Sequence, residues 1–299
     1  MLLLFGATMF LSALLLFWIE LVIAKMLLPH LGGTPAVWNT CMLFFQALLL
    51  AGYSYVLMTT AWIGARAQAV LYIALLVLST VYLPLTVAGN FAPVAAQDYP
   101  ALRLFGYLLR AIGLPIFVIS TISPLLQKWF TRTDHPSAKD PYFLFAISNA
   151  GSLAGLLSYP FLLEPNLSLS LQNRLWVGAY VLFSVLSLGC GIVVLEASRN
   201  GKLPGRVFVA NYAKPHPISL KRRLYWILVA FIPSSLLFGV TTYITTEIAP
   251  TPLLWTIPLA LYLVTLVLAF ARRNFASERV ASYALGGLAL LLTLVLAAN

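Results

Sequence analysis

The chain has 299 residues, of which 61% are hydrophobic and 9% are charged, which leaves too little polar surface to cover a water-soluble globule. This composition and the mean hydropathy of +0.94 indicate a polytopic membrane protein in contact with a lipid bilayer. The net charge of +10 does not indicate nucleic-acid binding, because that function needs a basic face on a soluble domain, and the basic residues here flank apolar segments.

Nine apolar segments are each long enough to cross a hydrocarbon core of about 30 Å at about 1.5 Å per residue. They cover residues 3–28, 37–60, 67–88, 102–122, 142–163, 175–195, 225–246, 253–270 and 280–297. The first segment has no basic region before it and no small-residue cleavage site after it. We therefore expect it to stay in the membrane rather than to be removed as a signal peptide.

Most of the 18 Lys and Arg residues fall in alternate loops between these segments. The positive-inside rule therefore predicts a cytoplasmic N-terminus and a C-terminus on the other side. The longest polar stretch, residues 197–224, contains several prolines and glycines and no apolar periodicity, so we predict a basic cytoplasmic linker. A positive-inside loop accounts for its charge better than binding to anionic lipid. The linker separates a six-helix half, residues 1–196, from the three-helix start of a second half, residues 225–299.

A weak internal repeat supports two halves. A TPxxW pattern precedes the second apolar segment at residues 34–38 and the eighth at residues 251–255. Both would lie at corresponding outward-facing elbows, as parallel repeats predict. Coincidence is an equal alternative, because proline at helix starts and tryptophan at membrane interfaces are each common.

Three stretches are distinctive: ELVIAKMLLPHLGGTPAVWNTCMLFFQALLLAGY at residues 20–53, SNAGSLAGLLSYPFLLEP at 148–165 and FIPSSLLFGVTTYITTEIAPTPLLWTIPLALYLVTLVLAF at 231–270. They resemble the membrane part of the bacterial fused major-facilitator/spermidine-synthase-like proteins. The resemblance implies an all-α, facilitator-like bundle in the bacterial inner membrane. Its second half would be incomplete, because a full facilitator-like fold has twelve helices.

The chain departs from that family in two respects. It has no Gly-rich nucleotide-binding turn and no acidic cluster of the kind that a synthase-like domain would bring, so we expect no aminopropyl transfer, no enzyme activity and no cofactor. The loop at residues 64–67, GARA, also lacks the acidic and multiple basic residues of the usual facilitator signature. This second difference argues against standard proton-coupled transport.

Glu20 is the leading candidate for a functional residue, because an ionisable side chain near mid-bilayer costs about 2.5–3.5 kcal/mol on insertion scales and needs a compensating partner or function. Gln46 and Arg110 lie at a similar depth, about 12 Å below the outer face. We predict that Glu20 and Arg110 form an ion pair that faces the bundle interior, with Gln46 beside it; a purely structural pair is an equal alternative. Lys25 is turned away from Glu20 and is expected at the outer interface.

Small residues at helical spacing on the fifth segment predict close helix packing: Ser148, Gly151, Ser152 and Gly155. Asn149 beside them is a candidate cavity-lining residue, as is Glu247 after the threonine-rich run of the seventh segment, although packing is the default interpretation there. The three histidines lie in separate loops and the two cysteines are far apart in sequence, so no metal site or catalytic constellation is expected.

The leading functional hypothesis is a facilitator-type transporter for a small polar or cationic solute, with a polyamine suggested only by the family resemblance. The alternative is a non-transporting membrane anchor, or a partner subunit for a separately encoded spermidine-synthase-like domain at the cytoplasmic face. A water-filled cavity that reaches Glu20 would favour transport.

Overall fold

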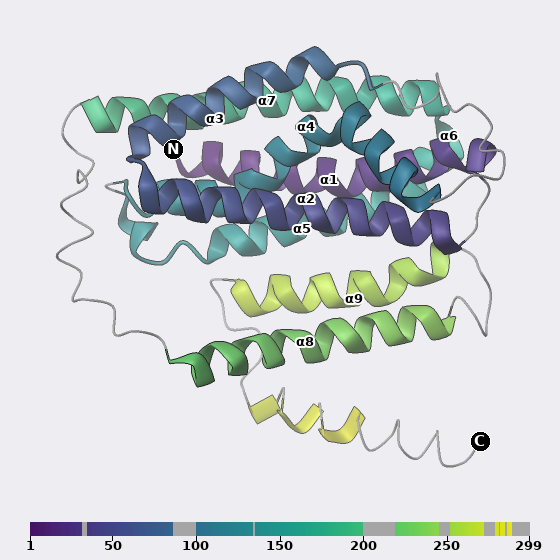
Figure 1. Cartoon of the computed structure of the whole chain (residues 1–299). Helices are drawn as coiled ribbons and strands as arrows, with labels where there is room; N and C mark the ends of the chain where they lie inside the picture. Colours follow the sequence, from purple (N-terminus) through teal and green to yellow (C-terminus); the bar gives the residue numbers. More distant parts are fainter. Residues whose placement is uncertain are drawn as a thin grey trace.

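The structure is a computed structural model that describes residues 1–31, 35–85, 100–133, 135–199, 219–244 and 252–271, with short stretches at 279–280, 282–284 and 286–288. The described residues form helices and no strand (Figure 1). The predicted all-α class is therefore confirmed for this part of the chain.

The main helices are α1 (Leu2–Leu31), α2 (Pro35–Trp62), α3 (Ala65–Ser79), α4 (Pro100–Phe130), α5 (Phe143–Ser158), α7 (Leu169–Arg199), α8 (Leu220–Tyr243) and α9 (Pro252–Phe270). Short elements join them: the 3₁₀ turns η1 (Thr80–Tyr82) and η2 (Pro136–Lys139), the π-helical turn η3 (Tyr159–Leu163) and the single turn α6 (Glu164–Asn166).

Seven helices in the described residues are long and apolar enough to cross a membrane. The eighth predicted segment forms α9, whose described apolar stretch is shorter, and most of the ninth, residues 280–297, lies outside the described residues. Both α2 and α9 begin at the proline of the repeated TPxxW pattern. The threonines of that pattern lie outside the described residues.

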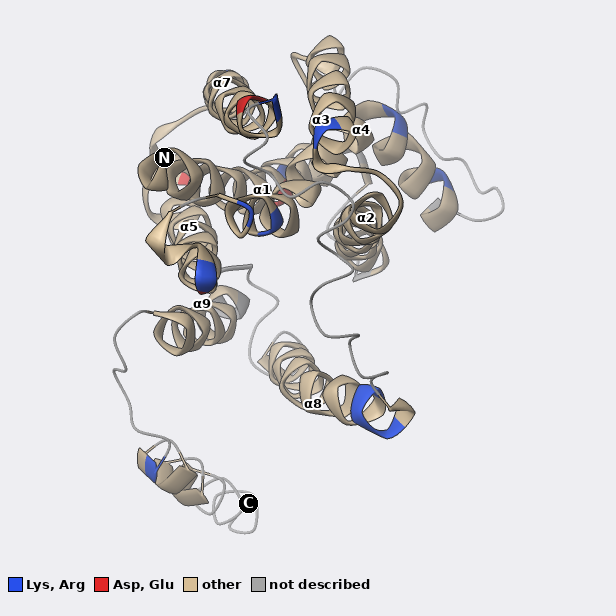
Figure 2. Cartoon of the chain, turned by 90° about the vertical axis from the view of Figure 1, so that its left-hand side faces the viewer, with Lys and Arg blue, Asp and Glu red and all other residues tan. Residues whose placement is uncertain are grey.

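Helix α1 lies at the centre of the bundle (Figure 2) and packs most extensively against α5, with further contacts to α7, α4 and α2. Half of its membrane-length stretch is buried, and Phe5, Met9 and Leu15 are completely inaccessible. Helix α8 is the opposite case, because none of its residues is buried and its contacts are mainly with α9.

Glycines on α5 allow α1 and α5 to meet at their backbones. A Cβ atom on Gly151 would overlap the carbonyl oxygen of Phe10, and one on Gly155 would lie 2.7 Å from that of Leu14. Neither position has room for a larger residue without separating the helices. The predicted close packing by the small-residue face is confirmed, and it fixes how α5 sits on the central helix.

Helix α4 extends beyond its predicted end at residue 122 and continues through Pro124 to Phe130. A proline removes one backbone hydrogen bond, so an internal proline usually ends or kinks a helix. Here the side chains of Trp129 and Phe130 are completely buried beyond it, so the last turns of the helix are held by packing. The predicted segment was therefore too short, because apolar length alone does not show how far the packing of side chains extends a helix.

The predicted linker is shorter than residues 197–224. Helix α7 continues to Arg199, and α8 begins at Leu220, where the Ser219 hydroxyl accepts a hydrogen bond from the Arg222 amide at 3.3 Å. This serine cap satisfies one of the free amides at the helix start and sets the boundary. Residues 200–218 lie outside the described part, so the division into two halves stays a prediction.

We expect Gly151→Ala to lower the stability of the bundle by about 1–3 kcal/mol, because the new methyl group forces α1 and α5 apart. Thermal unfolding of the purified protein in a single detergent measures this as a lower Tm. Gly178→Ala on α7 is the matched control, because a Cβ there meets no atom within 4 Å. Equal Tm values for the two variants would contradict the tight crossing.

Candidate functional site

The structure shows no hydrogen bond or ion pair among the predicted site residues that it describes. Glu20 on α1 is densely surrounded by protein atoms, yet part of its surface remains accessible. Gln46 on α2 and Arg110 on α4 are both exposed. Asn149 on α5 is buried and donates a hydrogen bond to the carbonyl oxygen of Phe145, one turn earlier in its own helix, at 2.8 Å. Glu247 lies outside the described residues.

The predicted ion pair between Glu20 and Arg110 is wrong. On α4, Leu108 and Ile112 are completely buried and define the face that packs into the bundle. Arg110 lies two positions from each of them, which turns it to roughly the opposite side of the helix. These residues were grouped by their depth along a helix, and depth does not determine which way a side chain points.

The same correction applies to Gln46. Its neighbours Phe44 and Phe45 on α2 are buried, whereas Gln46 is exposed. The residues around Gln46 are apolar on all sides of α2, so the sequence did not show which face of this helix meets the bundle. Gln46 is therefore not a hydrogen-bonding neighbour of Glu20.

Glu20 lies on the side of α1 between α2 and α5. One turn earlier, Phe17 packs against Gly155 of α5, and Cys41 of α2 is close enough to Glu20 to interact with it electrostatically. In Figure 2, α5 lies to the lower left of α1 and α2 lies to its right. Among the described residues Glu20 has no ion-pair or hydrogen-bond partner.

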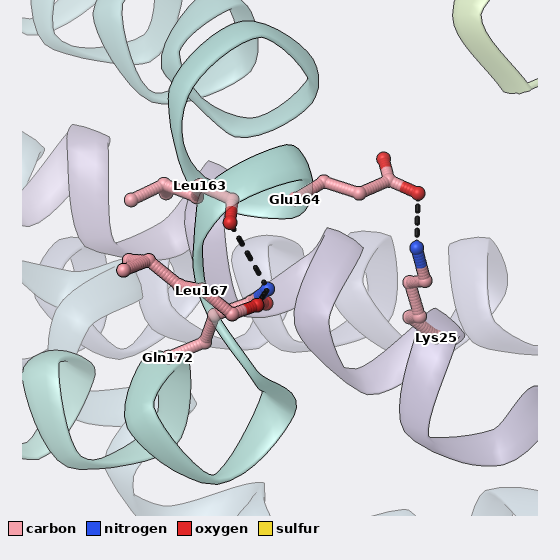
Figure 3. Close-up of polar contacts among 5 residues, drawn as sticks. All are labelled: Lys25, Leu163, Glu164, Leu167 and Gln172. Atoms are coloured by element: carbon pink, nitrogen blue, oxygen red, sulfur yellow. Dashed lines mark hydrogen bonds and ion pairs between the residues drawn. The ribbon is translucent and has the colours of Figure 1, made fainter.

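An ion pair does join α1 to the segment after α5, between the Lys25 ammonium and one carboxylate oxygen of Glu164 (Figure 3). Each side chain is 37% exposed. Sequence reasoning expected Lys25 only at the interface and missed this partner. The signal was available: residues 25 and 164 stand at the same end of two segments that run in the same direction, and the small residues of α5 indicated a close neighbour.

The chain widens into the π-helical turn η3 just before Glu164. Pro160 lies in this turn, and a proline deprives the preceding turn of a hydrogen-bond donor. The Gln172 amide of α7 donates to the carbonyl oxygens of Leu163 at 3.4 Å and Leu167 at 2.9 Å (Figure 3). Gln172 is 1% exposed, so a buried side chain satisfies the backbone that the widened turn leaves open. Short π-helical turns occur frequently at functional sites.

A second buried amide, Gln68, stabilises the other end of the bundle. It donates to the hydroxyls of Thr59 at 2.8 Å and Thr60 at 3.0 Å, and its oxygen accepts from the Trp129 indole at 3.1 Å. All hydrogen-bonding groups of this amide side chain that face the protein have partners. The network ties α2, α3 and α4 together and leaves no group free for a ligand.

No group of three or more His, Cys, Asp or Glu side chains that could hold a metal ion occurs within the described ranges. Two surface hollows lie along the start of α3 and beside the N-terminus, away from Glu20. No family model, no curated protein and no solved structure matches this chain. A function for this chain is therefore inferred from the geometry of its own residues.

We expect Gln172→Leu to lower the stability by about 1–3 kcal/mol, because it leaves the Leu163 and Leu167 carbonyl oxygens without their side-chain donor. Gln46→Leu is the matched control, since this exposed amide makes no hydrogen bond in the described part of the chain. Thermal unfolding of both variants in the same detergent checks the difference. A Tm that falls equally for both would show that the bonds to η3 contribute nothing specific.

Proposed function

We propose that the protein is a transporter of the facilitator type for a small polar or cationic solute, and that Glu20 binds the positive charge of that solute or of a coupled proton. The observation that carries the proposal is an accessible carboxyl group inside the apolar span Leu2–Pro29 with no partner among the described residues. Such groups are expensive in a membrane and persist mainly where they face a bundle interior or a pathway.

The place of Glu20 in the bundle supports this role. Glu20 is close to both α5 and α2, because Phe17 one turn earlier packs against Gly155 and Cys41 interacts electrostatically with Glu20. A solute bound there would be enclosed by several helices rather than by lipid. Binding sites at mid-membrane depth between helices are the usual arrangement in secondary transporters.

The charge distribution supports a multi-pass inner-membrane protein with a cytoplasmic N-terminus. Figure 2 views the bundle from the end where the chain starts. Basic residues gather there at helix ends: Arg66 in the first turn of α3, Arg199 in the last turn of α7, and Lys221, Arg222 and Arg223 in the first turn of α8. The positive-inside rule assigns this end to the cytoplasm.

The family resemblance suggests a polyamine as the first solute to test. We expect Glu20→Gln to reduce the uptake of radiolabelled 1,4-diaminobutane or spermidine by about tenfold or more, because a hydrogen bond to a charged group contributes about 1.5–3 kcal/mol. The measurement uses membrane vesicles that contain the overproduced protein and that carry an imposed membrane potential.

Glu196→Gln provides the control, because Glu196 is an exposed acid near the end of α7 with no partner in the described part. It should transport as the wild type does. Uptake that survives Glu20→Gln would refute the assignment of Glu20. Vesicles that take up no more cation than empty ones, together with a soluble protein that co-purifies with the chain, would favour the membrane-anchor function instead.

A further inference from the structure

We propose that Glu164, with Tyr159 beside it, is a second site for a protonated amine, and that Lys25 occupies it as a built-in competitor. The inference rests on the proposed function, because it takes the solute to be an organic cation. It concerns a different position from Glu20, near the end of α1 and α5 that lies away from the N-terminus (Figure 1).

The Lys25–Glu164 pair is open and only partly used. Both side chains are 37% exposed, so a solute can reach them from water. Lys25 contacts one carboxylate oxygen, and the other oxygen of Glu164 points away from it (Figure 3). A carboxylate accepts several hydrogen bonds, so this one retains capacity for another donor.

Tyr159 provides the second observation. Its side chain is 4% exposed, and its hydroxyl oxygen has no hydrogen-bond partner among the described residues. It lies close enough to Glu164 to interact electrostatically with that carboxylate. A buried hydroxyl without a partner costs about 1–3 kcal/mol, and an ammonium N–H group is a suitable donor to its oxygen.

The backbone allows this part of α5 to adjust. Up to Gly155 the helix is fixed to α1 by backbone contact, and beyond it the chain widens into η3 before reaching Glu164. Gln172 holds the carbonyl oxygens of this turn from the side away from Lys25 (Figure 3). Gln172 therefore anchors η3 on one side, and Glu164 follows it on the other side.

Exchange of partners at Glu164 is energetically inexpensive. The solute ammonium takes the place of the Lys25 ammonium, so the carboxylate stays neutralised, and Lys25 moves into water. An exposed ion pair contributes only about 0–1 kcal/mol, so little is lost when Lys25 leaves. Because Lys25 belongs to the same chain, it competes for the Glu164 carboxylate at an effective concentration of roughly millimolar. We therefore expect the wild type to bind the solute amine weakly.

Isothermal titration calorimetry with 1,4-diaminobutane on the purified full chain in detergent tests the proposal. We expect Lys25→Met to bind the diamine about tenfold more tightly than the wild type, because the competitor is gone. Glu164→Gln should abolish this gain, so that Lys25→Met/Glu164→Gln binds the diamine no more tightly than Glu164→Gln alone, while any binding at Glu20 is unaffected. A purely structural ion pair predicts no gain of affinity in Lys25→Met, and that result would overturn the proposal.

Three controls accompany the titration. Lys139→Met removes an exposed lysine near the opposite end of the bundle and should bind as the wild type does. The neutral 1,4-butanediol should give no heat, and equal heat from it would also overturn the proposal. Tm values establish that each variant is folded; if Glu164→Gln is not, the comparison of Lys25→Met with the wild type decides.

Glu20→Gln separates this inference from the proposed function. The tenfold gain of diamine affinity on Lys25→Met should persist in the Glu20→Gln background, whatever happens to transport. A retained gain with lost transport would leave both proposals standing. If Lys25→Met binds the diamine more tightly and Glu20→Gln still transports as the wild type does, the site at Glu164 is retained. The role of Glu20 in transport is then refuted.

Discussion

The backbone contact between α1 and α5 is the constraint on which the rest of the bundle depends. Without a hydrophobic driving force between helices in lipid, association relies on close packing, and Gly151 and Gly155 permit it against Phe10 and Leu14. Helices α4, α5 and α7 pack around α1, and α2 contacts α1 less extensively. The same crossing places residue 164 beside residue 25, so the Lys25–Glu164 ion pair is a consequence of these glycines.

The sequence specified the elements better than their orientation. Apolar length located all eight of the main helices to within a few residues at most ends, because a bilayer-length apolar run has few alternatives. It also indicated the α1–α5 contact, since small residues at helical spacing have one common use in membranes. Apolar length underestimated α4, whose last turns beyond residue 122 are held by the burial of Trp129.

The candidate site was less predictable for a physical reason. Helices that are apolar on every side have no polar face to mark which side meets water or lipid, so the direction of Arg110 or Gln46 depends on which neighbours the helix acquires. Residues assigned to a similar depth by counting can therefore point in different directions, and Arg110 is exposed whereas Glu20 is only partly accessible. The hydrogen bonds of Gln172 were equally hidden, because its partners are backbone carbonyl oxygens freed by an irregular turn.

The two charged positions on α1 demand different explanations. Lys25 is partly exposed and paired with Glu164 near a helix end, where ions cost little, so packing and solvation are sufficient to account for it. Glu20 lies within the span without such a partner in the described part, and neither argument applies to it. What the Lys25–Glu164 ion pair leaves unexplained is the unpartnered hydroxyl of Tyr159 next to it. A ligand with N–H groups would account for that hydroxyl, whereas the lysine alone, which contacts only the carboxylate, does not.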